Sequence, residues 1–263
     1  MRPFTEITDT ARKNIQYVLT DIDDTLTHEG KLPAIAYEAL ERLHAAQISV
    51  IPITGRPAGW CDHFARMWPI DAIIGENGAF YFRYDPVAKK MIRRYWKSET
   101  EREEDQLKIN QIKDEILIKI PRCAISTDQA YRESDLAVDF CEDVVRLPKA
   151  EIGKIVECFT NHGATAKISS IHVNGWYGNY NKLSMTRILF QEVFSSNLDD
   201  INEHIIFTGD SPNDAPMFSF FKNGTGVANI VDFEAEMENL PTWILSKKGG
   251  FGFAEMVDNL LKE

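Results

Sequence analysis

The chain has 263 residues, which is enough for one large domain or two modest ones at about 150 residues per domain. Hydrophobic residues make up 44% and charged residues 26%, which is typical of a globular protein with a sizeable core and excludes a disordered chain. Asp and Glu number 40 against 29 Lys and Arg, so the formal net charge is −11. This charge disfavours nucleic acid and an anionic membrane surface as partners.

The cysteines and the chain start bear on the compartment. Cys61, Cys123, Cys141 and Cys158 are scattered without C-x-x-C or zinc spacing, and we interpret them as reduced structural thiols. Residues 1–16 lack the apolar stretch of a signal peptide, and no apolar run approaches the ~18 residues of a membrane-spanning helix. We therefore expect a cytoplasmic protein, either a monomer or a small homo-oligomer.

The first 85 residues alternate strand and helix patterns. Residues 17–20 form a short apolar run, Pro33 opens an amphipathic helical stretch, and residues 48–53 form a second apolar run. This order predicts a parallel strand–helix–strand unit. Further strands are expected at 72–74 and 79–82.

The pattern changes after about residue 84. Thr100 and Glu103 form a capping box, which predicts a helix beginning there. Residues 136–140 alternate between apolar and other side chains, which predicts a half-buried strand. A helix from Pro148 to Gly163 and strands at 164–169 and 171–174 follow.

The first pattern resumes at Lys182. We expect helices at 183–194 and 253–261 and strands at 205–207, 226–228 and 242–245. The sequence therefore predicts an α/β fold, a Rossmann-like parallel sheet core with an inserted α+β cap domain. The expected divisions are core residues 1–85, cap residues 86–177 and core residues 178–263.

Polar residues follow the predicted core strands. Asp21 and Asp23 follow the first strand, Thr54-Gly55-Arg56 follow the second, and Gly209-Asp210 through Asp214 follow a later one. The carboxyl ends of parallel strands meet at one edge of the sheet, where ligands bind. A hydroxyl and backbone N–H groups suit a phosphate oxygen, and carboxylates suit Mg²⁺. With Lys182 at a helix start, the pattern indicates a magnesium phosphate site, although each segment alone has an ordinary reading as a turn.

These segments, in this order, resemble the four motifs of the haloacid dehalogenase superfamily of phosphohydrolases. Asp21-x-Asp23-x-Thr25 resembles the first motif, Thr54 the second, Lys182 the third and Gly209-Asp210-x-x-x-Asp214 the fourth. The interval from Thr54 to Lys182 has room for a cap of roughly 90 residues. A cap in that place resembles the type II members.

Three further segments are similar to the type IIB branch, namely Glu76-Asn77-Gly78-Ala79, Gly209 to Asp214 and Gly249 to Gly252. That branch includes sucrose-phosphate, mannosyl-3-phosphoglycerate and trehalose-phosphate phosphatases and eukaryotic phosphomannomutase. The chain departs from many relatives at Leu183, where they have Gly, and in the aromatic stretch 176–180.

The resemblance implies a Mg²⁺-dependent phosphatase acting on a small phosphorylated metabolite, a sugar phosphate. Asp21 would be the nucleophile that forms an aspartyl phosphate, and Asp23 the general acid and base. Lys182 and Thr54 complete the catalytic set. The metal set comprises Asp21, Asp23 through its backbone carbonyl, Asp210 and Asp214, of which Asp214 would hold Lys182 or a metal-bound water.

The remaining candidates concern substrate binding. Thr54, Gly55, Arg56 and Asn213 would contact the phosphate. In the cap, His172 and Asn174 share one face of a strand, with Lys167, Ser169 and Ser170 just before it. This polar set would recognise the leaving group, unless it is merely the solvated face of a sheet. Arg132 and Asp139 are further possible contacts.

Three other functions use the same fold. A phosphomutase would return the phosphoryl group to a bound sugar and would favour an arginine-rich cap. A carbon–halogen hydrolase would need neither Asp23 nor a metal site. A non-enzymatic binding protein would be expected to have lost Asp21, Asp23, Lys182 or Asp210, and all four are present.

Overall fold

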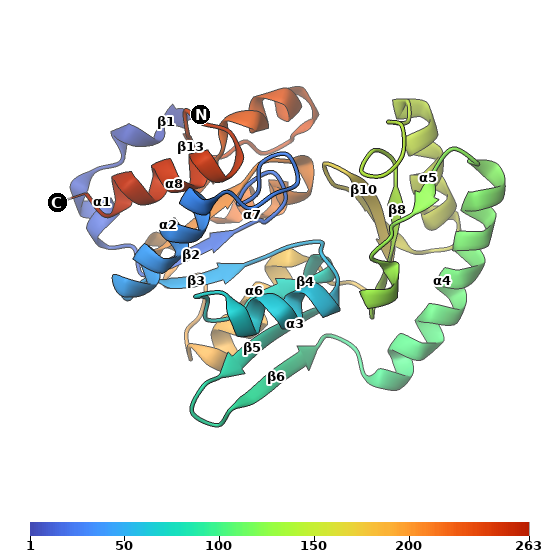
Figure 1. Ribbon diagram of the computed structural model, residues 1–263, viewed down its shortest axis with the longest axis horizontal. Coiled ribbons are helices and arrows are strands. Elements are labelled where there is room, and N and C mark those ends of the chain that lie inside the picture. The colour runs from blue at the N-terminus through green and yellow to red at the C-terminus, as the bar shows by residue number, and fades with distance from the viewer. Residues whose placement is uncertain (263) are drawn as a thin grey trace.

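The central element of the computed structural model, which describes residues 1–262, is a six-stranded sheet (Figure 1). All its strand pairs are parallel. In spatial order the strands are β1 (Arg2–Pro3), β13 (Trp243–Ile244), β12 (Asn223–Gly226), β11 (Ile205–Gly209), β2 (Tyr17–Thr20) and β3 (Ser49–Pro52). This confirms the predicted Rossmann-like α/β core.

Helices cover both faces of this sheet, because successive side chains of a strand point to opposite faces. Val18 of β2 joins an apolar cluster with side chains of α2 (Ala34–Ala45), α3 (Ala58–Met67) and α8 (Gly249–Leu260). Leu19 joins the opposite cluster, with α6 (Lys182–Val193) and α7 (Ala215–Phe220). None of the helices within residues 1–262 combines the length and apolar character that crossing a bilayer requires.

A three-stranded antiparallel sheet extends the core beyond β3. It consists of β4 (Ile73–Gly75), β5 (Phe80–Asp85) and β6 (Lys90–Tyr95). A parallel bridge between Ile53 and Ile74 aligns β4 with the end of β3. Since β6 pairs with β5 along its length, the predicted cap start at residue 86 falls inside this hairpin. We propose that the cap begins near Trp96 instead.

The other lobe in Figure 1 is a four-stranded antiparallel sheet covered by two helices. In spatial order the strands are β7 (Ala124–Ile125), β8 (Asp135–Asp139), β10 (His172–Trp176) and β9 (Thr165–Ile168), and the helices are α4 (Glu99–Lys119) and α5 (Lys149–Asn161). Leu136, Val138 and Val173 share one apolar cluster with these helices. The alternate side chains, including His172 and Asn174, belong to the face that the helices leave uncovered.

The short elements complete the chain. They are α1 (Asp9–Lys13) and the 3₁₀ helices η1 (Phe4–Glu6), η2 (Glu76–Gly78), η3 (Gln129–Tyr131), η4 (Asn202–His204), η5 (Pro212–Asp214) and η6 (Ala228–Glu236). The N-terminal residues belong to the core, because β1 pairs with β13 and the guanidinium of Arg12 donates to the carbonyl of Leu260 (3.2 Å).

Three local predictions were wrong. The capping box of α4 is formed by Ser98 and Glu101, two residues earlier than expected. Strand β8 is buried on both faces rather than one, because the core covers its polar face. The strand expected at 226–228 lies at 223–226, where Asn-Gly-Thr-Gly has the composition of a turn but pairs between β11 and β13.

The cap core supplies a stability test. Phe159 of α5 is fully buried, and its ring packs so closely on Gly175 of β10 that a Cβ there would overlap it. We expect Phe159→Ala to lower the free energy of unfolding by about 3–5 kcal/mol, measured by urea denaturation. Ile118→Ala, at a side chain 81% exposed, is the control and should cost less than about 0.5 kcal/mol. A loss below about 1 kcal/mol for Phe159→Ala would contradict this packing.

Candidate active site

The carboxyl ends of three adjacent parallel strands define the site. Asp21 follows β2, Thr54 follows β3 and Asp210 follows β11, and all three side chains are buried. The backbone N–H of Asp21 donates to the carbonyl of Thr208 at 2.8 Å, which extends the β2–β11 ladder into the site. The structure therefore brings these strand-end residues to one edge of the sheet.

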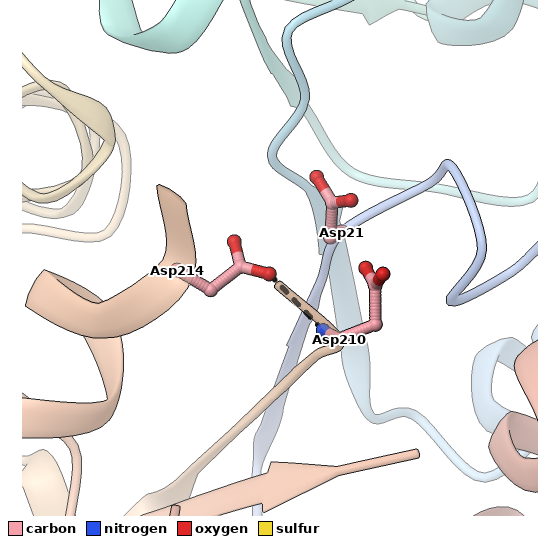
Figure 2. A group of neighbouring side chains, drawn as sticks. All are labelled: Asp21, Asp210 and Asp214. Carbon is pink, nitrogen blue, oxygen red and sulfur yellow. Dashed lines mark hydrogen bonds between the residues drawn. The ribbon is translucent and has the colours of Figure 1, made fainter. Parts of the chain in front are cut away.

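Three carboxylates and one ammonium converge at this edge. One oxygen each of Asp21, Asp210 and Asp214 lies within 4.8 Å of the other two, and Figure 2 shows the three side chains facing a common space. The Nζ atom of Lys182 donates to Asp21 Oδ1 at 2.7 Å and to Asp214 Oδ1 at 2.8 Å. These contacts join α6 to the ends of β2 and β11.

Local backbone features place Asp214 and Lys182. The carboxylate of Asp214 folds back and accepts from the N–H of Asp210 at 3.1 Å, so closely over Gly209 that a Cβ there would lie 2.4 Å from its Oδ2 (Figure 2). Lys182 is the first residue of α6, and Asn181 caps that helix by accepting from Ser184 N. A lysine there opposes the helix dipole, and the two carboxylates offset that cost.

Burial of like charges sets the protonation of the site. Loss of solvent and the neighbouring carboxylates raise the pKa of Asp21 to about 7, although Lys182 acts in the opposite direction. Burial, followed by the charges of Asp21 and Asp214, raises the pKa of Asp210 well above its ordinary value. Burial lowers the pKa of Lys182, but Asp21 and Asp214 outweigh it and the net direction is upward. The ammonium of Lys182 is therefore charged. Its single positive charge is not enough to balance the neighbouring carboxylates.

This excess of negative charge fits a divalent cation. Asp21 uses one oxygen for Lys182, and Asp210 Oδ1 accepts from Thr25 Oγ1 at 2.9 Å, which orients its carboxylate. Both oxygens of Asp214 are engaged, one by Lys182 and the other by backbone N–H groups. Asp21 and Asp210 are thus the carboxylates best placed to hold a cation with oxygen ligands, and Asp214 holds Lys182.

Asp23 takes a different partner. Its two oxygens accept from Arg56 Nε and Nη2 at 2.8–3.0 Å. Nη2 also donates to Glu142 Oε1 of the cap at 2.9 Å, and Nη1 lies 3.4 Å from Asp128 Oδ2. The guanidinium predicted to bind phosphate is therefore shared among three carboxylates and connects the core to the cap.

Residues 18–135 match the family model of haloacid dehalogenase-like hydrolases. That range includes the turns of Asp21 and Thr54, whose convergence is described above. Over this range the chain is similar to haloacid dehalogenase-like hydrolases. No curated protein matches the sequence.

Solved structures share the fold of this chain over nearly its whole length. One is a protein from Thermoplasma acidophilum, 17% identical, with a TM-score of 0.69 over 94% of this chain and 98% of that chain. Another is a phosphatase of the superfamily from Bacteroides thetaiotaomicron, 16% identical, with a TM-score of 0.61 and 97% of each chain covered. A third is a trehalose-6-phosphate phosphatase related protein, 15% identical, with a TM-score of 0.59 over 93% and 95% of the two chains.

The residues predicted to bind phosphate lie around Asp21. Thr54 Oγ1 accepts from the N–H of Arg56 at 3.0 Å, which leaves its own hydrogen free to donate. Gly55 and Asn213 line the same cavity as Asp21. Asn213 Oδ1 accepts from Ser211 Oγ at 2.7 Å, so its amide nitrogen is the atom left for a ligand.

The cap closes this cavity with its polar face. Ser169, Ser170, His172 and Asn174 line it together with Asp21, and His172 and Asn174 are each only 3% exposed. That face is therefore covered by the core and is not open to solvent. Ser169 Oγ accepts from the N–H of His172 and so shapes the turn before β10. Lys167 is exposed and is absent from the lining of this cavity, but it lines the adjoining one.

The two further cap candidates have internal partners. The guanidinium of Arg132 is paired with Asp128 and Asp135 and donates to the Gly55 carbonyl at 2.9 Å. The carboxylate of Asp139 accepts from three backbone N–H groups just after β8. Both residues are thus committed to holding the cap and its junction with the core.

Two carboxylates at the core–cap junction were given no role in the sequence analysis. Glu142 Oε2 lies 2.9 Å from His172 Nε2, and this contact together with Arg56 lowers the pKa of Glu142 to about 2. Glu76 of the core accepts from the N–H groups of Glu133 and Ser134 in the cap, and burial raises its pKa to about 8. For Glu76, the available signal was the segment Glu76-Asn77-Gly78-Ala79, which was compared with the type IIB branch without a role being given to Glu76.

The raised pKa of Asp21 predicts how folding stability depends on pH. An aspartate whose folded pKa is about 7, above its unfolded value near 3.8, favours folding below about pH 4 and loses that contribution as pH rises through 7. In EDTA, we therefore expect Asp21→Asn to raise Tm relative to wild type by more at about pH 8 than at about pH 4.5, measured by circular dichroism. Asp199→Asn, at an exposed ion pair, is the control. If the Tm difference between Asp21→Asn and wild type shrinks with rising pH, this electrostatic account is contradicted.

Proposed function

We propose that the protein is a Mg²⁺-dependent phosphatase that hydrolyses a small phosphorylated metabolite, a sugar phosphate, through an aspartyl phosphate on Asp21. The observation that carries the proposal is the buried ammonium of Lys182 held between Asp21 and Asp214, with Asp210 beside them. Phosphoryl transfer to aspartate requires a carboxylate nucleophile, a fixed positive charge such as that of Lys182, and carboxylates that can hold a metal ion.

In the first step, the free oxygen of Asp21 attacks phosphorus in line while the bond from phosphorus to the leaving oxygen breaks. Lys182 lowers the repulsion between the carboxylate and the phosphate dianion. A bound Mg²⁺ supplies further charge neutralisation at the phosphate oxygens, and Asp21, Asp210 and the Asp23 carbonyl are the groups we expect to hold it. Water then hydrolyses the aspartyl phosphate.

Asp23 is the proposed general acid for the leaving group and then the general base for water. Both of its oxygens accept from Arg56, so this pairing must open before Asp23 can contact the leaving group or a water. Arg56 keeps a second partner in Glu142, which can retain the guanidinium when Asp23 leaves it. Cap position and acid catalysis would thereby be linked.

The closed cap leaves little space above Asp21. The cavity there measures about 20 Å³, and a single water needs roughly 10–15 Å³. Substrate entry therefore requires the cap to move. We infer that Thr54, Gly55 and Asn213 contact the phosphoryl group, while Ser170, His172 and Asn174 reach the leaving group.

The sugar-phosphate and branch assignments have separate support. The insertion between Thr54 and Lys182 supports a type II cap. The fold shared with the trehalose-6-phosphate phosphatase related protein supports the type IIB branch. A phosphomutase is less well supported, because the described residues that line the Asp21 cavity from the cap include no arginine. A cytoplasmic location and a small oligomeric state stay predictions from the sequence.

The first functional prediction concerns the metal. Because three buried carboxylates share only one lysine, we expect hydrolysis of p-nitrophenyl phosphate to disappear in EDTA and to return when Mg²⁺ is added in excess. Released p-nitrophenol measures the rate. Full activity in EDTA would remove the metal from the mechanism.

The second concerns the nucleophile. Asp21→Asn keeps the side-chain volume but removes the attacking anion, so kcat with Mg²⁺ should fall by on the order of 10³-fold or more. Asp199→Asn is the matched control and should retain wild-type turnover, since its side chain is exposed and pairs only with Arg187. Retention of about a tenth of the rate by Asp21→Asn would sink the assignment of Asp21.

A further inference from the structure

A second cavity lies next to the catalytic one. It measures about 140 Å³, has room for several waters, and is lined by Asn77 of the core, Trp176 and Tyr180 at the junction with the cap, and Lys182. Asn213 lines both cavities, so they adjoin. A ligand bound at Asp21 can therefore extend towards this second space.

Three of the residues that line it carry a buried donor with no partner within residues 1–262. The donors are the amide nitrogen of Asn77, the indole nitrogen of Trp176 and the hydroxyl of Tyr180, on side chains no more than 5% exposed. Buried polar groups are nearly always satisfied, and leaving one unsatisfied costs free energy. Three such groups on one cavity indicate acceptor atoms that the protein itself does not supply.

The arrangement of the walls is fixed. The rings of Trp176 and Tyr180 stack at 5.6 Å and 19°, and Trp96 lies 6.0 Å from Tyr180. Asn77 has a left-handed backbone (φ 56°), and the next residue, Gly78 (φ 107°), approaches the Asn181 carbonyl so closely that a Cβ would lie 2.2 Å from it. The donors are therefore preorganised and do not need a ligand to position them.

The charge of the cavity selects the ligand. Its lining includes no carboxylate and no arginine among the described residues, and of its two lysines Lys182 is paired with Asp21 and Asp214 while Lys167 is exposed. The buried unpartnered donors are neutral amide, indole and phenol groups, which suit uncharged oxygens, and the ammonium of Lys167 adds a single positive charge to the lining. Aromatic walls with neutral donors suit a polyhydroxylated ring.

We propose that this cavity binds hydroxyl oxygens of the sugar part of the substrate, through Asn77, Trp176 and Tyr180. The proposal rests on the phosphatase function proposed above and adds a subsite at the end of β10, beyond His172 and Asn174. Since these contacts are remote from phosphorus, they strengthen substrate binding and transition-state binding alike and act on KM more than on kcat.

Tyr180→Phe is the decisive variant. It removes one unpartnered hydroxyl and conserves the ring, so Tm should stay the same or rise. KM for the hexose phosphate with the highest kcat/KM in a panel should increase about 2- to 12-fold, the effect of one neutral hydrogen bond. KM for p-nitrophenyl phosphate, which has no sugar, should stay within about 2-fold of wild type.

Two further variants make the test specific. Asn77→Gly keeps the left-handed backbone and removes the amide, and it should show the same split between the two substrates. Tyr81→Phe is the matched control, because its hydroxyl donates to Glu192 at 2.8 Å and its residue lines neither cavity. It should lower Tm and leave both KM values unchanged.

The outcomes separate this proposal from the function on which it rests. If KM for the hexose phosphate is unchanged in both Tyr180→Phe and Asn77→Gly, water alone fills the cavity and the proposal is overturned. An equal rise in KM for p-nitrophenyl phosphate, or wild-type activity on that compound but on no sugar phosphate, also overturns it and leaves the phosphatase standing. If the wild-type protein with Mg²⁺ hydrolyses no phosphate ester at all, both the subsite proposal and the proposed phosphatase function are refuted.

Discussion

The constraint on which the site depends is the burial of one ammonium among three carboxylates. An isolated buried lysine is very costly, and Lys182 is tolerated only because Asp21 and Asp214 lie within 2.8 Å of it. The lysine in turn does not neutralise all the carboxylates, as the raised pKa values of Asp21 and Asp210 indicate. Neither the buried lysine nor the three carboxylates would be stable without the other. Such an arrangement lowers stability and is typical of a functional site.

The parallel sheet makes this balance possible. Strands β2 and β11 are hydrogen-bonded neighbours that end at the same edge, so their following residues meet without any further device. Close backbone approaches then complete the site. Gly209 lets the carboxylate of Asp214 fold over the end of β11, and Gly78 lets η2 approach the first turn of α6. A side chain at either position would displace the groups that hold Lys182.

At the junction of cap and core, buried polar groups again depend on partners from a distant part of the chain. Its sheet is apolar towards α4 and α5 and polar towards Asp21, so the polar face needs partners that are not in the cap. Arg56 and Glu76 of the core supply them, through Glu142 and the N–H groups of Glu133 and Ser134. Polar junctions of this kind can separate and reform, because water replaces their partners. Such a junction suits a cap that must open for substrate.

The sequence by itself determined the alternation of strands and helices, the strand-end positions of Asp21, Thr54 and Asp210, and the presence of an inserted α+β cap. These follow from local hydrophobic period and from the rule that parallel strands end together, which need no knowledge of distant contacts. Strand β12 could not be predicted, because Asn-Gly-Thr-Gly becomes a strand only through pairing with β11 and β13. Only the tertiary structure decided the partners of Arg56, the burial of both faces of β8 and the unpartnered donors of the second cavity. Each depends on how the cap packs against the core. That contact joins residues far apart in the chain, and the local sequence pattern around one residue does not predict its distant partner.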